Sequence, residues 1–479
     1  MKFIGREEYL AKLDTLWRKQ SSSFAVVSGR RRIGKSTLVE EFARRSRCRF
    51  IEIAGLPPAK GMTNQIQIDN FCERLAAATG MPEARADCWA KAFDALAAAV
   101  DSREKTIVFL DEISWMGKYD PAFPGILKTA WDMRFARKAK LVFVVAGSVS
   151  AWIQENIQHA KGYVGRISLD TTLSDLSLRE CLGFWGRKAE RTSTREILDV
   201  LSVTGGVPKY LAEIDTGLTA DENVRRLCFD PDGYLYGDFN RIFDDVFDAT
   251  VASKRRIVTA LADGAASASE LAKRFGSDPN GHLSSDLKEL VEAGFVAASE
   301  GLNPQTGRAV REVRYRLRDN YTRFYLKYVL PKRAAIESGV FRYCPLDRLP
   351  GWDTIMGLQF ENLVLNNFAT LAAEIGLVGK SVESVAPYFK RGGKKSKEDK
   401  GVQIDMLVQL PKCVYVVETK RQNKIGVETE TEVERKIERL AIPKGKSVKT
   451  VLVYDGVIAP ELEEDGFFDF LVPADRLMR

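Results

Sequence analysis

The 479-residue chain contains only two histidines, His159 and His282, and its seven cysteines form no C-x-x-C pair. Zinc sites and histidine-based acid–base chemistry are therefore disfavoured, because both depend mainly on these residue types. An odd number of scattered cysteines also disfavours a disulfide framework and agrees with a reducing, cytoplasmic location. Any catalysis then has to depend on carboxylates, lysines, hydroxyls and bound cations.

Long apolar runs are also missing. The longest, residues 141–153, contains Gly and Ser and falls short of the roughly 20 residues that span a bilayer. The first eight residues carry charges where a signal peptide needs an apolar stretch, so export is not expected. With 45% hydrophobic and 29% charged residues, the composition predicts a soluble globular protein. At roughly 150 residues per domain, the length predicts about three domains.

Three short β-branched runs in the first third predict strands buried on both faces of a parallel sheet: Phe24–Val27, Thr106–Leu110 and Leu141–Val145. Helical patterns separate them, for example at residues 38–43 and 88–100. Alternating strands and helices predict an α/β layer with ligands at the carboxyl ends of the strands.

A phosphate-binding loop follows the first of these runs. Residues 29–36 fit the pattern G-x-x-x-x-G-K-[ST], and a helical pattern follows them. A strand before the loop and a helix after it are the context that such a loop requires. Its backbone N–H groups would face phosphate oxygens, the lysine would neutralise the β- and γ-phosphates of ATP, and the serine would hold Mg²⁺. Its arginines would contact nucleotide or a partner, or form a solvated basic loop. The predicted nucleotide-binding residues are Gly29, Arg30, Arg31, Arg32, Ile33, Gly34, Lys35, Ser36 and Thr37.

Acidic residues end the second predicted strand. We expect Asp111 to reach the same Mg²⁺ through water, and Glu112 to orient or deprotonate the attacking water. At the end of the third strand, Ser148 would sense the γ-phosphate, or would only be a small residue at a tight strand exit.

Taken as an ordered set, these motifs resemble the archaeal-type AAA+ ATPase family, which are STAND-like P-loop ATPases. The set is Phe3-Ile4-Gly5-Arg6-Glu7, the phosphate loop, Asp111-Glu112, Ala146-Gly147-Ser148, Gly165-Arg166 and Gly205-Gly206-Val207-Pro208-Lys209-Tyr210-Leu211. The resemblance covers residues 1–328, and relatives often carry a C-terminal nuclease-like domain. It implies that Gly5-Arg6 and Pro208 border the adenine. It also implies that Arg166 contributes to γ-phosphate recognition, although a Gly-Arg pair suits a surface salt bridge equally well.

A winged helix is predicted next. Helical segments at residues 254–262, 268–275 and 282–293 lead into Gly294-Phe295-Val296 and an alternating strand at 313–318. The strand would place Arg314, Arg316 and Arg318 on one face, where they would contact DNA phosphates. The third helix is acidic, which disfavours it as a recognition helix. The alternative is an interdomain packing module whose wing faces the ATPase.

The last part of the chain, α/β again, resembles the PD-(D/E)xK nuclease core. Asp405 begins one apolar strand, and Glu418-Thr419-Lys420 closes the next after a gap of twelve residues. Two carboxylates can hold Mg²⁺ on a scissile phosphate while the lysine steadies the attacking water, and Glu361 on an upstream helix would supply a third carboxylate. A salt-bridged strand end is the alternative. The basic loop at 390–400 would clamp a nucleic-acid backbone or be a solvated hairpin.

The predicted fold is therefore an α/β P-loop NTPase (AAA+-like) parallel sheet at residues 1–170 with a helical lid and connector at 171–248. A winged-helix domain at 249–335 and an α/β restriction-endonuclease-like domain at 336–479 follow. The predicted function is a Mg²⁺-dependent ATPase that couples nucleotide state to DNA binding, with a metal-dependent nuclease site at Asp405, Glu418 and Lys420. The alternatives are a nucleotide-dependent switch that binds DNA or protein and cuts nothing, and an interaction scaffold. A homo-oligomer or protein partner is also expected.

Overall fold

The computed structural model describes residues 3–101, 103–148, 151–247, 251–276, 281–310, 312–392, 401–440 and 442–479. The chain forms two compact units, Met1–Asp175 with Glu292–Gly294, and Leu176–Val291 with Phe295–Arg479. We describe each by itself. Among the described residues, no helix combines the length and apolar character that crossing a membrane requires.

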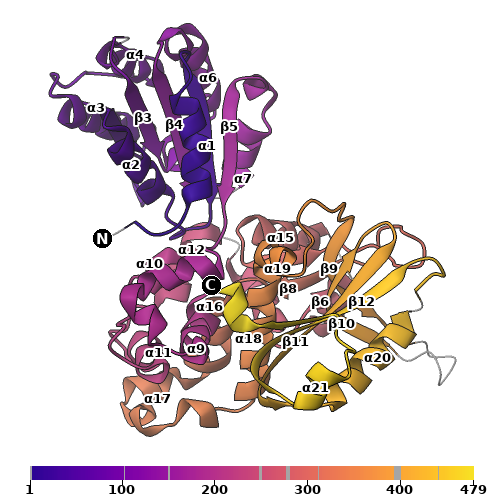
Figure 1. Ribbon diagram of the computed structural model, residues 1–479. Helices are drawn as coiled ribbons and strands as arrows, with labels where there is room; N and C mark the ends of the chain where they lie inside the picture. Colours follow the sequence, from indigo (N-terminus) through magenta and orange to yellow (C-terminus); the bar gives the residue numbers. More distant parts are fainter. Residues whose placement is uncertain are drawn as a thin grey trace. The chain divides into compact units, whose positions relative to one another are not determined.

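The first unit contains a parallel five-stranded sheet in the order β2-β3-β4-β1-β5 (Figure 1). The three predicted strands are confirmed, and two edge strands join them. Only part of each edge strand is buried, which is why neither has a continuous apolar run. The strands are β1 (Ser23–Gly29), β2 (Arg49–Ala54), β3 (Thr106–Asp111), β4 (Leu141–Ser148) and β5 (Ile167–Leu173).

Strand β5 corrects one prediction. The segment from about Thr171 was expected to be helical, but Thr171–Leu173 completes a strand that pairs in parallel with β1. The polar and apolar residues of β5 alternate, so a period-two signal was present in the sequence.

Helices cover both faces of this sheet, because successive strand residues point to opposite sides. Phe24, Val26 and Val108 pack with α3, α4 and α6, whereas Ala25, Val27 and Phe109 pack with α1 and α2. The helices are α1 (Glu7–Trp17), α2 (Lys35–Ser46), α3 (Asn64–Thr79), α4 (Trp89–Ala99), α5 (Ile113–Gly117), α6 (Phe123–Met133) and α7 (Ala151–Ile153).

The second unit begins with helices. Capping boxes start two of them, at Ser177 and Thr219, where the side chain accepts from the third backbone amide and a glutamate closes the motif. The helices are α8 (Leu178–Cys181), α9 (Thr194–Thr204), α10 (Pro208–Leu211), α11 (Ala220–Cys228) and α12 (Asp238–Phe247).

The predicted winged-helix elements follow. Helices α13 (Val251–Leu261), α14 (Ala268–Arg274) and α15 (Gly281–Glu292) precede an antiparallel hairpin of β7 (Val296–Ser299) and β8 (Arg314–Leu317). The short strand β6 (Ala266–Ser267) pairs with β8 and gives the order β6-β8-β7. The pattern of three helices and a hairpin is confirmed.

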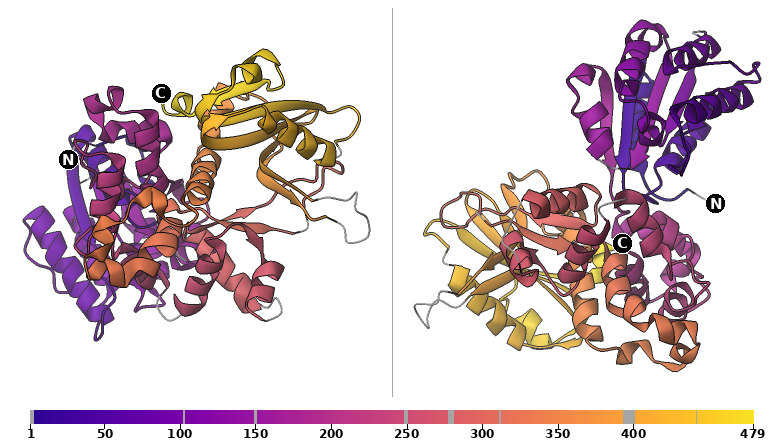
Figure 2. Two further views of the ribbon diagram at one scale, coloured as in Figure 1. Left: turned by 90° about the horizontal axis from the view of Figure 1, so that it is seen from below. Right: turned by 180° about the vertical axis from the view of Figure 1, so that it is seen from behind.

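The end of the chain forms a mixed sheet in the order β13-β12-β11-β10-β9, shown in orange and yellow in Figure 2. Strands β9 to β11 are antiparallel and β11 to β13 are parallel. Helix α18 packs on one face of the sheet and α20 on the other. The elements are α16 (Asn320–Phe324), α17 (Arg333–Glu337), α18 (Trp352–Asn366), α19 (Phe368–Glu374), β9 (Ser384–Lys390), β10 (Val402–Gln409), β11 (Cys413–Ile425), α20 (Glu428–Leu440), β12 (Ser447–Ile458), α21 (Pro460–Glu464) and β13 (Phe470–Pro473).

Candidate functional sites

The phosphate loop connects the end of β1 to the first residue of α2. Arg32 (φ 69°) and Gly34 (φ 88°) adopt left-handed backbone conformations. A Cβ on Gly29 would lie 3.0 Å from the carbonyl oxygen of Leu173 and 3.0 Å from a methyl of Ile33. The glycines therefore permit the turn and its close approach to β5, and the loop delivers its amides to the N-terminus of a twelve-residue helix.

The Lys35 ammonium lies inside the loop. Its Nζ donates to the carbonyl oxygens of Gly29 at 3.2 Å and Arg30 at 3.3 Å. Burial lowers the pKa of Lys35, while the carboxylates of Glu112 and Asp111 act in the opposite direction. The loop thus presents a desolvated cation, and the attraction between such a cation and phosphate charge is strong because the local dielectric constant is low.

Ser36 and Asp111 meet although they lie on different elements. The Ser36 hydroxyl donates to Asp111 Oδ2 at 2.6 Å. Strand β4 lies between β1 and β3, and the parallel register brings the carboxyl ends of all three strands to one edge. A hydroxyl and a carboxylate are oxygen ligands of the kind that Mg²⁺ prefers, so this pair fits the ion that the loop implies.

Glu112 has an unusual environment for a carboxylate. Its backbone is left-handed (φ 49°), and its buried Oε2 has no hydrogen-bond partner among the described residues. Burial raises the pKa of Glu112, and a hydrogen bond to the backbone of Ser148 partly offsets this effect. A buried, raised-pKa acid beside a phosphate loop is placed to accept a proton. The predicted sensor Ser148 thus contacts Glu112 through its backbone.

The remaining loop residues are engaged within the first unit. The Arg31 guanidinium lies over the Trp115 ring at 5.6 Å, and Arg30 lies 3.9 Å from Asp175. Ile33 is fully buried, and Thr37 is exposed on α2. The buried Arg6, from the Gly5-Arg6 motif, donates to the carbonyl of Ile33 at 3.1 Å. This contact attaches the N-terminal segment to the loop.

Arg166 does not reach the phosphate loop of its own chain. Its guanidinium pairs with both carboxylate oxygens of Asp132 on α6, at 2.7 and 2.9 Å. The following residue, Ile167, pairs with Phe24 near the start of β1, five residues before Gly29. At about 3.3 Å per residue, that separation is roughly 17 Å. The alternative salt bridge is what the structure contains, and a contribution of Arg166 to γ-phosphate recognition remains a prediction.

The Gly205-Gly206-Val207-Pro208 motif has a structural role in the second unit. The Leu176 amide donates to the Gly206 carbonyl at 2.8 Å, and a Cβ on Gly206 would lie 2.2 Å from the Leu176 carbonyl oxygen. Pro208 occupies the first turn of α10, where its missing N–H costs nothing. Its predicted contact with adenine remains a prediction.

The arginines of strand β8 do not form an exposed row. Arg316 donates to Asn362 and Asn366 of α18, the second at 3.0 Å. Arg314 pairs with Glu270 at 3.1 Å and stacks on Phe389 of β9 at 3.9 Å. Arg318 is half-buried, and its carbonyl accepts from both asparagines. The wing therefore packs against α18 and β9 rather than presenting three free guanidiniums to DNA.

Three acidic residues converge in the C-terminal sheet and α18. The β10–β11 register, with Met406 opposite Val417, brings Asp405 next to Glu418. Burial and the charge of Asp405 raise the pKa values of both Glu361 and Glu418. Asp405 Oδ2 accepts from the Thr419 amide at 2.9 Å and from its hydroxyl at 2.8 Å. The predicted acids thus lie close enough for the charge of Asp405 to act on both glutamates.

Two further residues of this cluster come from α20 and were not predicted. Lys436 Nζ lies 2.6 Å from Glu418 Oε2, and Lys420 Nζ lies 3.1 Å from Glu418 Oε1. Glu432 pairs with both lysines, at 2.7 and 2.9 Å. The sequence signal for these residues was an acid and a lysine four residues apart on a helix, which is too common to single out.

The donor chemistry of the acids suits a divalent cation, because all are carboxylates. Within the part of the chain that the structure describes, however, no group of three or more His, Cys, Asp or Glu is arranged to hold a metal ion. Of the basic loop at 390–400, residues 393–400 lie outside the described residues. Arg391 is described, and it pairs with Glu270 at 2.7 Å.

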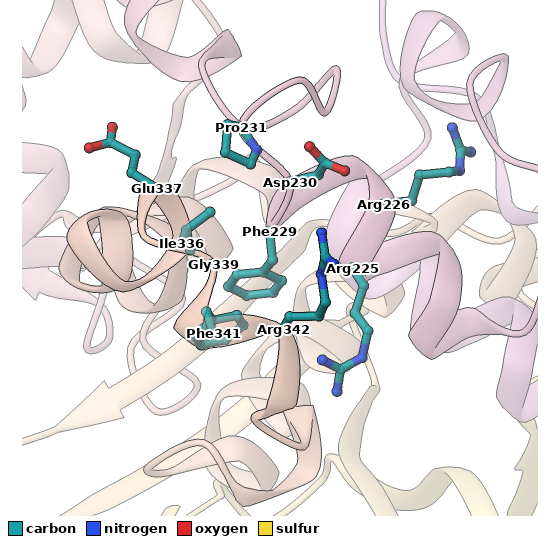
Figure 3. Close-up of a pocket in the computed structure, with 10 residues that line it drawn as sticks. All are labelled: Arg225, Arg226, Phe229, Asp230, Pro231, Ile336, Glu337, Gly339, Phe341 and Arg342. Carbon is teal, nitrogen blue, oxygen red and sulfur yellow. The ribbon is translucent and has the colours of Figure 1, made fainter.

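A separate arginine-lined cavity of about 290 Å³ lies between α11 and the segment around α17 (Figure 3). Phe229 and Phe341 stack at its floor, with ring centroids 4.4 Å apart. Two of its arginines have local partners: Arg225 contacts Asp221 and the Cys344 carbonyl, and Arg226 contacts Asn223. No motif of the sequence maps to this cavity.

Comparisons with known proteins identify two domains in the chain. Residues 3–214 match the family described as an ATPase domain predominantly from Archaea, and residues 253–297 match a helix-turn-helix domain. An uncharacterized protein of Methanocaldococcus jannaschii is 21% identical over 342 residues, which is 71% of each chain.

Among solved structures, the Walker-type ATPase of Pyrococcus abyssi has a TM-score of 0.50 and 16% identity, covering 68% of this chain and 96% of that one. The ORC2 protein of Aeropyrum pernix has a TM-score of 0.41 and 15% identity, covering 70% of this chain and 93% of that one. The first likeness shows the fold alone. The chain therefore carries an archaeal-type ATPase domain with the P-loop fold, followed by a helix-turn-helix domain.

Proposed function

We propose that this protein is a Mg²⁺-dependent ATPase whose nucleotide state controls nucleic-acid binding by its second unit. The hydrogen bond between Ser36 and Asp111 carries the proposal, because it joins the phosphate loop to the acidic end of β3. It supports a site in which a hydroxyl and a carboxylate share one cation next to the desolvated Lys35.

Each residue has a role that follows from its surroundings. Lys35 would release the loop carbonyls and bind the β- and γ-phosphates. Ser36 and Asp111 would hold Mg²⁺, which neutralises charge on the phosphate oxygens when bound. Glu112 would orient the attacking water and accept its proton, since its raised pKa favours proton uptake.

Two substitutions test this assignment. We expect Lys35→Ala to abolish binding of a fluorescent ATP analogue. Glu112→Gln should keep that binding within about threefold and lower turnover by about 10²–10³-fold, the usual cost of losing a general base. Glu40→Gln, at an exposed position of α2 outside the loop, is the matched control and should behave like the parent. Equal turnover of Glu112→Gln and the parent would rule out the role of Glu112.

DNA is the proposed nucleic acid because a helix-turn-helix match covers residues 253–297. The inward packing of Arg314 and Arg316 supports a contact through other residues of this domain, or through the wing after it separates from α18. A test is the salt dependence of DNA affinity with ATP and with ADP. Identical affinity and slope with both nucleotides would show that nucleotide state does not control binding.

A metal-dependent nuclease site at Asp405, Glu418 and Lys420, with Glu361, is the second proposal. The raised pKa values of Glu361 and Glu418, caused by burial and by the charge of Asp405, support it, since like charges gather where a cation is to bind. The pairing of Glu418 with two lysines favours the alternative of an inactive nuclease-like domain in a nucleotide-dependent switch. Cleavage of plasmid and single-stranded DNA with Mn²⁺, compared with Asp405→Ala, separates the two.

A further inference from the structure

A second cavity of about 290 Å³ lies between the winged-helix sheet, α18 and the neighbouring strands β9 and β10. Its wall includes three arginines from the wing and α16, one acid from α18 and two aromatic rings from β9. These residues are Arg314, Arg316, Arg323, Glu361, Tyr388 and Phe389. The volume suits one nucleotide-sized ligand and is too small for several.

Two of these arginines keep hydrogen-bond donors unused. Arg323 is only 3% exposed; its Nη1 donates to Gln359 at 2.7 Å and its Nη2 to the Leu317 carbonyl at 3.3 Å. Arg316 donates through both Nη atoms to Asn362 and Asn366. The buried Nε atoms of both arginines have no partner among the described residues. Leaving a buried donor unpaired is unfavourable, so an acceptor entering the cavity would be favoured.

The charge of the cavity favours an anion. Burial lowers the pKa of Arg316 to about 9 and that of Arg323 to about 10, which leaves both charged at neutral pH. The cavity is lined by four arginines, Arg274 being the fourth, and by two acids, Glu361 and Asp263, of which Asp263 pairs with Lys327. Guanidinium groups match the geometry of phosphate oxygens.

The aromatic wall is held in place by Arg314. Its guanidinium lies 3.9 Å from the Phe389 ring centroid, and its other contacts are Glu270 and the Ala265 carbonyl at 2.6 Å. The ring is half-buried. A ring fixed at the wall of a cationic cavity is the arrangement on which nucleobases stack.

We propose that this cavity binds a nucleotide with a terminal phosphate, with Arg316 and Arg323 holding the phosphate and Phe389 contacting the base. The choice of ligand depends on the proposed nucleic-acid function, but the binding requires no cleavage. The same chemistry occurs at the phosphorylated end of a DNA strand and in a free nucleoside monophosphate, and the experiment distinguishes the two.

The test is fluorescence anisotropy with the full chain, in EDTA and in a Lys35→Ala background that removes the phosphate loop as a competing site. Internally labelled tetranucleotides carry a phosphate at the 5′ end, at the 3′ end or at neither. We expect one phosphorylated probe to bind at least tenfold more tightly than the unphosphorylated one. Competition by an unlabelled nucleoside monophosphate at equal affinity would identify the free nucleotide as the ligand and support the pocket.

Three variants test whether the preference for phosphorylated probes arises in this cavity. Arg316→Gln should reduce the phosphate preference to within twofold, and Phe389→Leu, at the half-buried wall, should weaken all probes without disturbing the arginines. Arg342→Gln, in the other cavity of equal volume, should keep the full preference. No preference in the parent, or equal loss in Arg342→Gln, would overturn the proposal. If DNA is cleaved in the Mn²⁺ assay but the binding assay shows no phosphate preference, only the proposal for this cavity is refuted. If the phosphate preference is present but no DNA is cleaved, only the nuclease proposal is refuted.

Discussion

Lys436 Nζ lies 2.6 Å from Glu418 Oε2, so the glutamate of the E-x-K motif contacts a lysine from α20 in addition to Lys420. Glu418 is almost fully buried, and Glu432 completes a ring of alternating charges with the two lysines. Removing one lysine from such a ring leaves the negative charge of a buried glutamate with too few neighbouring positive charges.

Lys436→Met should therefore destabilise the protein. We expect a loss of about 1–3 kcal/mol in the free energy of unfolding at pH 8, measured by urea denaturation. The loss should be smaller at pH 6, because the raised pKa of Glu418 allows that group to take up a proton there. Lys424→Met, at an exposed position of β11, is the control and should have little effect. An equal loss at both pH values would contradict the explanation.

Glu361→Gln should stabilise the protein at alkaline pH. The raised folded-state pKa of Glu361 means that its contribution to stability is present below the unfolded-state value of about 4.3 and is lost as pH rises through the folded value. A neutral isostere avoids that loss. We expect a gain of about 1–3 kcal/mol at pH 9 and none at pH 4, measured by chemical denaturation. A gain that does not change with pH would indicate a packing effect instead.

Arg166→Ala should leave ATP turnover within about threefold of the parent at low protein concentration, because Arg166 is paired with Asp132 at the opposite end of β1 from the phosphate loop. A double-mutant cycle with Asp132→Asn should give a coupling of about 1 kcal/mol or less, since both side chains are partly exposed. A hundredfold loss of turnover would instead indicate that Arg166 acts on the site of another copy.

Gly206→Ala should destabilise the second unit, because the added Cβ would lie 2.2 Å from the Leu176 carbonyl oxygen. Overpacking of this kind costs about 1–3 kcal/mol, which thermal unfolding would detect. Gly237→Ala is the control, since nothing lies within 4 Å of its Cβ position. Equal stability of the two variants would show that the backbone near Leu176 can shift.

Much of the fold was predictable because its signals are local. The buried strands β1, β3 and β4 are continuous apolar runs, and the phosphate loop has its glycines at fixed offsets. The edge strands β2 and β5 were missed because half-burial leaves polar residues in them. The three helices and the hairpin of the winged helix were also predicted correctly, because their sequence signals are local as well.

The sequence by itself determined where the loop forms and that Asp111 ends β3, because both depend on backbone freedom and on strand periodicity. The prediction that Asp405 begins one strand and Glu418-Thr419-Lys420 closes the next is wrong, because β10 begins at Val402 and β11 continues to Ile425. Only the tertiary structure decided the partners of charged side chains. Arg166 pairs with Asp132, Arg316 contacts α18, and Lys436 reaches Glu418. These contacts depend on which distant segments pack together, and an arginine or lysine carries the same charge whether it meets a phosphate or a carboxylate of its own chain.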